Sequence, residues 1–178
     1  VIGTSADGNV MKQAENYNSS ISADVNDDIL KSRYLEEFNI KEGDLGIKEI
    51  TTKAGRNIGM SQNGEFVDVR GVKMSGYIDR YTTGKSTIHI SHKYVMGDIV
   101  DFRAVAGHEL THSYHAHFFK SKYVKSFSES VAYRYTAQVY MNAGRYQMAN
   151  SVMNIAKQYG YYPQSYSLQG KIKSMWFY

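Results

Sequence analysis

The pattern of hydrophobic and polar positions changes character three times along the chain. Residues 1–22 are polar, rich in Ser, Asn and Gly, and have no lasting period, which is typical of a loosely packed arm. From 24 to 38, apolar residues recur at helical spacing, and Asp24 or Asn26 can cap the start. The pattern predicts a helix here that ends near Gly43.

Between 46 and 92 the period shortens to that of β-strands. Asn63-Gly64 favours a hairpin between 58–60 and the strand that starts at Phe66, and Tyr81-Thr-Thr-Gly84 is a second turn. Four segments are rich in β-branched residues and alternate in polarity: Ile47–Thr51, Phe66–Arg70, Val72–Ile78 and Ser86–Ser91. Together they predict one antiparallel or mixed sheet of three to five strands.

The rest of the chain has a mostly helical period. Asp98 can cap a helix over 99–119, and two more helices are expected over 126–143 and 145–159. The expected core face of the first is Phe102, Val105, Ala106, Leu110 and part of Tyr114, and that of the last is Met148, Val152, Ile155 and Ala156. A final stretch, 165–178, follows the only proline and is expected to contain a short helix or strand.

This order of elements predicts one α+β domain over residues 1–178. A small antiparallel or mixed sheet in the N-terminal half should pack against a helical C-terminal half. The length is sufficient for one sizeable core, and no internal repeat or inter-domain linker is visible.

The composition narrows the classes of function. No apolar run is long enough to span a bilayer, and the absence of cysteine excludes disulfides, cysteine-ligated zinc and a thiol nucleophile. The net charge of +4 comes from scattered Lys and Arg, which favours a solvated basic surface over nucleic-acid binding. A nucleic-acid binder would have to stack bases on aromatic residues such as Tyr161, Tyr162, Tyr166 and Trp176.

His108-Glu-Leu-Thr-His112 is the segment with the strongest chemical content. Residues four apart lie on one face of a helix, so His108 and His112 can offer two imidazoles to one metal ion. Glu109 lies on the adjoining face, where its carboxylate can reach a water at the metal as a general base. The alternative is a helix that carries two histidines beside a solvated glutamate.

A catalytic zinc ion needs a third protein ligand. His115 lies about 10 Å from His108 along a continuous helix axis, which is too far for one ion, and His117 points away from the pair. A polar surface role or a role behind the ligands is therefore favoured for both histidines. Glu129, at the start of the next predicted helix, can face back towards His108 and His112 and complete a His₂Glu set. Alternatively, Glu129 only stabilises the helix N-terminus.

These motifs resemble those of the gluzincin branch of the zincin metallopeptidases. In that branch an H-E-x-x-H helix is followed by a glutamate ligand on a second helix, as His108–His112 is followed here by Glu129-Ser-Val-Ala132. The resemblance implies that His108, His112 and Glu129 bind zinc and that Glu109 is the catalytic base. It also implies a strand whose edge holds the substrate in extended form, and Thr87–Ser91 is the matching segment.

The chain departs from this family at one position. Some gluzincins have an aspartate four residues after the glutamate ligand, which orients a metal-binding histidine, and here Tyr133 stands there. The partner that orients the ligands must therefore come from elsewhere. Tyr133 and Tyr135 are the candidates to polarise the substrate carbonyl, and Tyr133 is preferred because it shares the helix face of Glu129.

The sequence therefore predicts a zinc-dependent metallopeptidase with one Zn²⁺ per chain and a peptide or protein substrate. The alternative is a non-catalytic metal-binding or peptide-binding module. Val1 begins neither an initiator sequence nor a signal peptide, which favours a processed product or a domain of a longer, exported protein. The architecture is similar to peptidase domains that end long secreted bacterial toxins.

Overall fold

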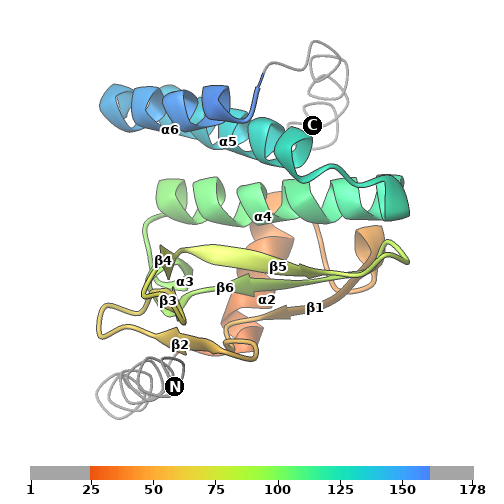
Figure 1. The fold of residues 1–178 in the computed structure, drawn as a ribbon. Helices are drawn as coiled ribbons and strands as arrows, with labels where there is room; N and C mark the ends of the chain where they lie inside the picture. The colour runs from red at the N-terminus through yellow and green to blue at the C-terminus, as the bar shows by residue number, and fades with distance from the viewer. Residues whose placement is uncertain (1–24, 161–178) are drawn as a thin grey trace.

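The computed structural model describes residues 25–160, so the predictions for 1–22 and 165–178 lie outside the described residues. The fold is α+β, as the sequence predicted, with two small sheets in the N-terminal half and helices in the C-terminal half. Three layers are visible in Figure 1: the strands, the long helix α4 (Ile99–Phe119), and a pair formed by α5 (Lys125–Asn142) and α6 (Tyr146–Gln158).

The first sheet is mixed and has the order β1-β6-β5. β1 (Ile47–Thr51) is parallel to β6 (Ser86–Ile90), and β5 (Gly76–Arg80) is antiparallel to it. The predicted turn at Tyr81–Gly84 joins β5 to β6, where Gly84 has a positive φ of 86° and its amide donates to the Tyr81 carbonyl. β6 is therefore the central strand, and all five of its residues are buried.

The second sheet is antiparallel and has the order β2-β3-β4. β2 (Ile58–Met60) and β3 (Phe66–Asp68) form the hairpin predicted from Asn63-Gly64, and β4 is Lys73–Met74. The predicted single sheet and the single strand over Val72–Ile78 are wrong. The chain changes sheets at Ser75: β4 pairs with β3, whereas β5 pairs with β6, and the Ser91 amide donates to the Ser75 carbonyl at the crossing.

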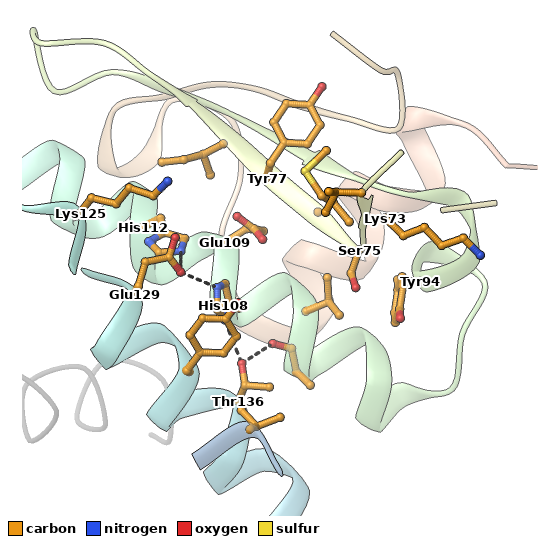
Figure 2. A pocket seen from close by; sticks show the side chains of 18 of the residues that line it. Lys73, Ser75, Tyr77, Tyr94, His108, Glu109, His112, Lys125, Glu129 and Thr136 are labelled. Carbon is orange, nitrogen blue, oxygen red and sulfur yellow. Dashed lines mark hydrogen bonds and ion pairs between the residues drawn. The ribbon is translucent and has the colours of Figure 1, made fainter. Parts of the chain in front are cut away.

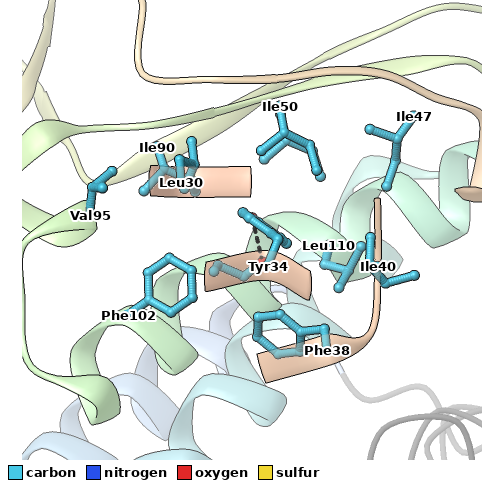
Figure 3. Packing of buried hydrophobic residues seen from close by; sticks show 12 residues of the cluster. Leu30, Tyr34, Phe38, Ile40, Ile47, Ile50, Ile90, Val95, Phe102 and Leu110 are labelled. Carbon is cyan, nitrogen blue, oxygen red and sulfur yellow. Dashed lines mark hydrogen bonds between the residues drawn. The ribbon is translucent and has the colours of Figure 1, made fainter. Parts of the chain in front are cut away.

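The main core lies between the mixed sheet, α4 and the helix α2 (Asp27–Phe38) (Figure 3). Asn26, one of the two predicted caps, caps α2, and the helix ends at Phe38, before Gly43 is reached, because the next residue, Asn39, has a φ of +53°. Tyr34 is fully buried, and its hydroxyl donates to the Ala106 carbonyl of α4 at 3.0 Å. The other buried members of the cluster are Leu30, Phe38, Ile40, Ile47, Ile50, Ile88, Ile90, Val95, Phe102, Ala106 and Leu110.

The predicted limits of α4 are confirmed, and its cap Asp98 accepts from the amides of Val100 and Asp101. The predicted core face holds for Phe102, Ala106 and Leu110, while Tyr114 belongs to a separate small cluster with Val131. Between α4 and β6 lies the short helix α3 (His92–Val95), and two 3₁₀ turns, η1 (Asp44–Gly46) and η2 (Lys120–Lys122), complete the described elements.

The predicted core face of α6 is only partly correct. Ala156 is buried and Val152 packs against the second cluster, but the side chains of Met148 and Ile155 are 43% and 36% exposed. Ala149 takes their place against α5 because the buried face of α6 is narrow and made of small residues. In the described part of the chain, no helix has the length and apolarity needed to cross a membrane.

A glycine allows α5 to approach α4 closely. A Cβ added to Gly107 would overlap the ring edge and hydroxyl of Tyr135. The Tyr135 hydroxyl in turn donates to the Arg103 carbonyl of α4 at 3.0 Å. A side chain at Gly107 would therefore push the two helices apart.

Gly107→Ala should lower the free energy of unfolding by about 1–3 kcal/mol, because overpacking forces a tight interface to shift. Urea denaturation measures this loss. In a Tyr135→Ala background the same substitution should be neutral or stabilising, since alanine is the better helix former by about 1 kcal/mol. An equal loss in both backgrounds would show that the Tyr135 contact is not its cause.

Candidate metal centre

Two helices bring the three predicted ligands together. His108 and His112 lie one turn apart on α4, with ring centroids 4.9 Å apart, and Glu129 lies near the start of α5. Glu129 Oε2 is 3.6 Å from His108 Nε2 and 3.4 Å from His112 Nε2 (Figure 2). One potential ligand atom of each residue lies within 4.8 Å of the other two. The described residues contain no other group of three metal-ligand side chains.

The charges of this group favour a bound cation. Burial alone would raise the pKa of Glu129, but hydrogen bonding to His108 and His112 holds that pKa well below its usual range. Glu129 is therefore a carboxylate at neutral pH. Two imidazole nitrogens and one carboxylate oxygen are a donor set that suits zinc and leaves a coordination position open.

Both histidines are oriented by hydroxyl groups of α5. His108 Nδ1 lies 3.1 Å from Thr136 Oγ1, which also contacts the Ala104 and Ala132 carbonyls. His112 Nδ1 lies 2.7 Å from Ser128 Oγ. If each Nδ1 carries the proton, each Nε2 directs its lone pair towards Glu129 and the shared position. Thr136 and Ser128 thus take the orienting role that the sequence left unassigned.

The two remaining histidines of α4 are not part of the group. His115 is completely buried, so a surface role is wrong for it, and its Nδ1 lies 2.9 Å from the same Ser128 Oγ. Burial and the charge of His112 lower the pKa of His115 to about 3, so this imidazole is neutral. Its Nε2 has no hydrogen-bond partner among residues 25–160. His117 lies at the end of α4 and packs near Gly46.

Glu109 lies beside the three candidate ligands but does not belong to their group. Its side chain is buried, and this burial raises the pKa of its carboxyl group against the opposing charges of His108 and His112. A Cβ added to Gly76 of β5 would lie 3.0 Å from Glu109 Cγ, so a glycine is needed where the strand passes over this carboxylate. Glu109 is thus held between α4 and β5.

The group opens into a cavity of about 710 Å³. Its walls come from α4, α5, β5 and the segment that contains β4, and its residues include Glu109, Tyr123 and Tyr133 as well as the three candidate ligands. The side chains drawn in Figure 2 surround this space. The cavity can therefore place a bound molecule against His108, His112 and Glu129, which are called the metal group below.

Tyr133 and Tyr135, the two candidates to polarise the substrate carbonyl, lie in different environments. The Tyr133 ring lies 4.6 Å from the His108 ring, lines the cavity and stacks on Tyr159. Burial, followed by the charge of Glu129, raises the pKa of Tyr133 to about 12. Tyr135 instead binds the Arg103 carbonyl and does not line the cavity. Tyr123, which the sequence did not single out, has its hydroxyl 3.3 Å from His112 Nδ1.

The segment expected to hold substrate along its edge is not an edge strand. Thr87–Ser91 belongs largely to β6, which lies between β1 and β5. β5 is one of the two edge strands of this sheet, and Gly76, Tyr77 and Ile78 from it line the cavity. The prediction assigned the substrate-holding edge to β6, the strand that comes directly before the helices in sequence. In the structure β5, the strand before it in the hairpin, lies next to the metal group.

Comparison with known proteins gives no relative for this chain: no family model matches it, and neither the curated proteins nor the solved structures include a significant match.

For a divalent ion held by the three ligands, Ser128→Ala should weaken binding about 10–100-fold, because His112 loses the group that orients it. Competition with a chromogenic chelator measures the dissociation constant. Ser121→Ala, at an exposed serine of η2, is the matched control and should change nothing. Equal affinities of the two variants would contradict the orienting role of Ser128.

Proposed function

We propose that this chain is a zinc-dependent metallopeptidase that hydrolyses peptide bonds. The proposal rests on one observation: His108, His112 and Glu129 gather their ligand atoms within 4.8 Å in the wall of an open cavity. The buried carboxylate of Glu109 lies beside them. Two imidazoles, one carboxylate and an adjacent base are the parts that a hydrolytic zinc site needs.

Zinc, when bound, polarises the scissile carbonyl and lowers the pKa of water towards about 7. Glu109 accepts the proton of the attacking water and delivers it to the amine nitrogen that leaves. The raised pKa of Glu109 supports this double role, because a more basic carboxylate takes up the proton more readily. The position of Glu109 between α4 and β5 limits its motion during the transfer.

Tyr133 is the proposed donor to the carbonyl oxygen. With a pKa of about 12, its hydroxyl keeps its proton at neutral pH and can donate a hydrogen bond. Among the described residues this hydroxyl has no hydrogen-bond partner, and the ring contacts the rings of His108 and Tyr159. The hydroxyl is thus available to a ligand in the cavity.

The free edge of β5 supports a peptide as substrate. β5 pairs with β6 on one side, and no other described strand pairs with it. An extended peptide can add to such an edge through main-chain hydrogen bonds, largely independently of its sequence. Gly76 of this strand lies against Glu109, so a peptide bound there would pass the proposed base.

Glu109→Gln should keep about one zinc per chain but lower kcat by about 10²–10⁴, since it removes only the proton acceptor. Glu129→Ala should weaken zinc binding by more than the roughly 10–100-fold expected when a ligand only loses its hydrogen-bond partner, because it removes a ligand itself. Zinc content by atomic emission and hydrolysis of a quenched casein substrate check both variants. Glu36→Ala, at an exposed glutamate of α2, is the control and should behave like the parent.

The alternative, a non-catalytic metal- or peptide-binding module, gives a different result. In that case zinc binding by the parent would still depend on Glu129, but the zinc-loaded parent would cleave the casein substrate no faster than Glu109→Gln does. Zinc affinity unchanged in Glu129→Ala would overturn the ligand assignment itself.

Tyr133→Phe should lower kcat by about 10²-fold with little change in KM, because the hydrogen bond strengthens as charge develops on the carbonyl oxygen. Steady-state kinetics on one peptide gives both constants. Tyr123→Phe is the informative comparison, since it removes a hydroxyl that contacts His112 instead. A larger loss of kcat in Tyr123→Phe, at equal zinc content, would assign the donor role to Tyr123.

A further inference from the structure

The residues of the cavity differ between its two ends. Along α5, Lys125, Glu129 and Tyr133 follow each other at intervals of four, so they lie on one helix face. All three line the cavity, as does Tyr140 beyond them. We call the end at Lys125, beside the connection between α4 and α5, the turn end, and the end at Tyr140 the far end. In Figure 2 the metal group lies between Lys125 and Thr136, and Tyr140 is one helical turn beyond Thr136 on α5.

The turn end is positively charged. Arg80 from β5 and Lys125 from α5 both line it, and the Arg80 guanidinium lies 4.4 Å from the centre of the Tyr123 ring. No acidic residue occurs between Glu109 and Glu129, while that interval contains Lys120, Lys122 and Lys125. Within residues 25–160, neither Arg80 nor Lys125 forms an ion pair with a carboxylate. No carboxylate in this part of the chain therefore neutralises the charge of either side chain.

The acidic residues of the cavity do not offset this charge. Glu109 and Glu129 are the carboxylates among the lining residues, and both are engaged in the proposed metal chemistry. Lys73, which lies on the side away from Lys125 in Figure 2, differs from Arg80 and Lys125 because it pairs with Glu65 at 3.6 Å. An anionic side chain is therefore favoured specifically at the turn end.

The far end is apolar and aromatic. Val105 lies one turn before Glu109 on α4, and Tyr140 and Val152 come from α5 and α6. Tyr94 and Val72 extend this lining, and the side chain of Val72 is 48% exposed. A bulky apolar side chain bound here would cover surface that water otherwise contacts.

The spacing fits a peptide bound across the metal group. Lys125 lies four residues before Glu129, about 6 Å along the helix axis. Side chains on one face of an extended peptide repeat at about 6.6 Å, so a residue within two positions of the scissile bond reaches Lys125. Arg80 lies four residues beyond Gly76 on the same strand face, farther along this direction.

We propose that the cavity selects peptides with an acidic residue within two positions of the scissile bond on the turn-end side and a bulky apolar residue on the other. This inference rests on the proposed peptidase function and names its substrate class. The selected feature is a carboxylate that pairs with Lys125 and Arg80 while the apolar side chain occupies the far end.

The test uses the zinc-loaded full chain and quenched fluorescent peptides that vary at the two positions. Glu at the turn-end position should give a kcat/KM about tenfold above Gln, from two partly exposed ion pairs, and Lys should be cleaved more slowly than Gln. Phe or Leu at the other position should exceed Ser. The preference for Glu should diminish at 1 M salt, where the screening length is about 3 Å.

Charge reversal provides the matched comparison. Lys125→Glu should invert the preference, so that Lys peptides are cleaved faster than Glu peptides. This variant should fold, because an acidic residue at the first position of α5 favours the helix dipole. Lys122→Glu changes an exposed cation of η2 that does not line the cavity, and it should leave the preference unchanged.

The outcomes separate this inference from the function on which it rests. Zinc-dependent cleavage of all peptides at equal rates, or an equal effect of Lys122→Glu, would overturn the substrate class and leave the peptidase intact. Cleavage of no peptide would overturn the peptidase function. In that case, fluorescence anisotropy would measure how tightly the Glu and Gln peptides bind to the zinc-loaded Glu109→Gln variant. Tighter binding of the Glu peptide, lost when Lys125→Glu is added, would show that Lys125 still selects an acidic ligand. If a single-stranded oligonucleotide displaced the bound Glu peptide as effectively as the unlabelled Glu peptide does, a nucleic-acid ligand would be favoured and the proposal contradicted.

Discussion

The close approach of α5 to α4 is the contact on which the candidate site depends. Gly107 permits this approach, and the hydrogen bond from Tyr135 to the Arg103 carbonyl maintains it. The same interface places Glu129 beside two imidazoles, and further contacts place Thr136 and Ser128 behind them. A small displacement of α5 would alter the ligand group, its orienting hydroxyls and the cavity wall together.

Local sequence information was sufficient for the parts of the site that follow from helix geometry. His108 and His112 share a face because they are four residues apart, and Asp98 marks the start of their helix. Glu129 could be proposed because the length between the two helices allows the chain to turn back. Ser128 and Thr136 could not be assigned, since a hydroxyl in a helix has no pattern that shows which distant imidazole it contacts.

Tertiary packing decided what the sequence could not. The sequence left a surface role open for His115, yet its side chain is completely buried and contacts Ser128 and Phe127 of α5. The hairpin turns at Asn63-Gly64 and Tyr81–Gly84 were predictable because their glycines adopt positive φ. The change of sheets at Ser75 was not, because both strands that flank it have the same alternating pattern and only their partners differ.

The three candidate ligands come from two different layers of the fold, with His108 and His112 on α4 and Glu129 on α5. Any ion bound by all three is a cross-link between these layers. Its binding energy would therefore add to the free energy that holds α5 against α4, by about 2.7 kcal/mol at a hundredfold excess over the dissociation constant. Folding stability and occupancy of the site would then be thermodynamically coupled, so the concentration of free metal would change the stability of the packing between α4 and α5.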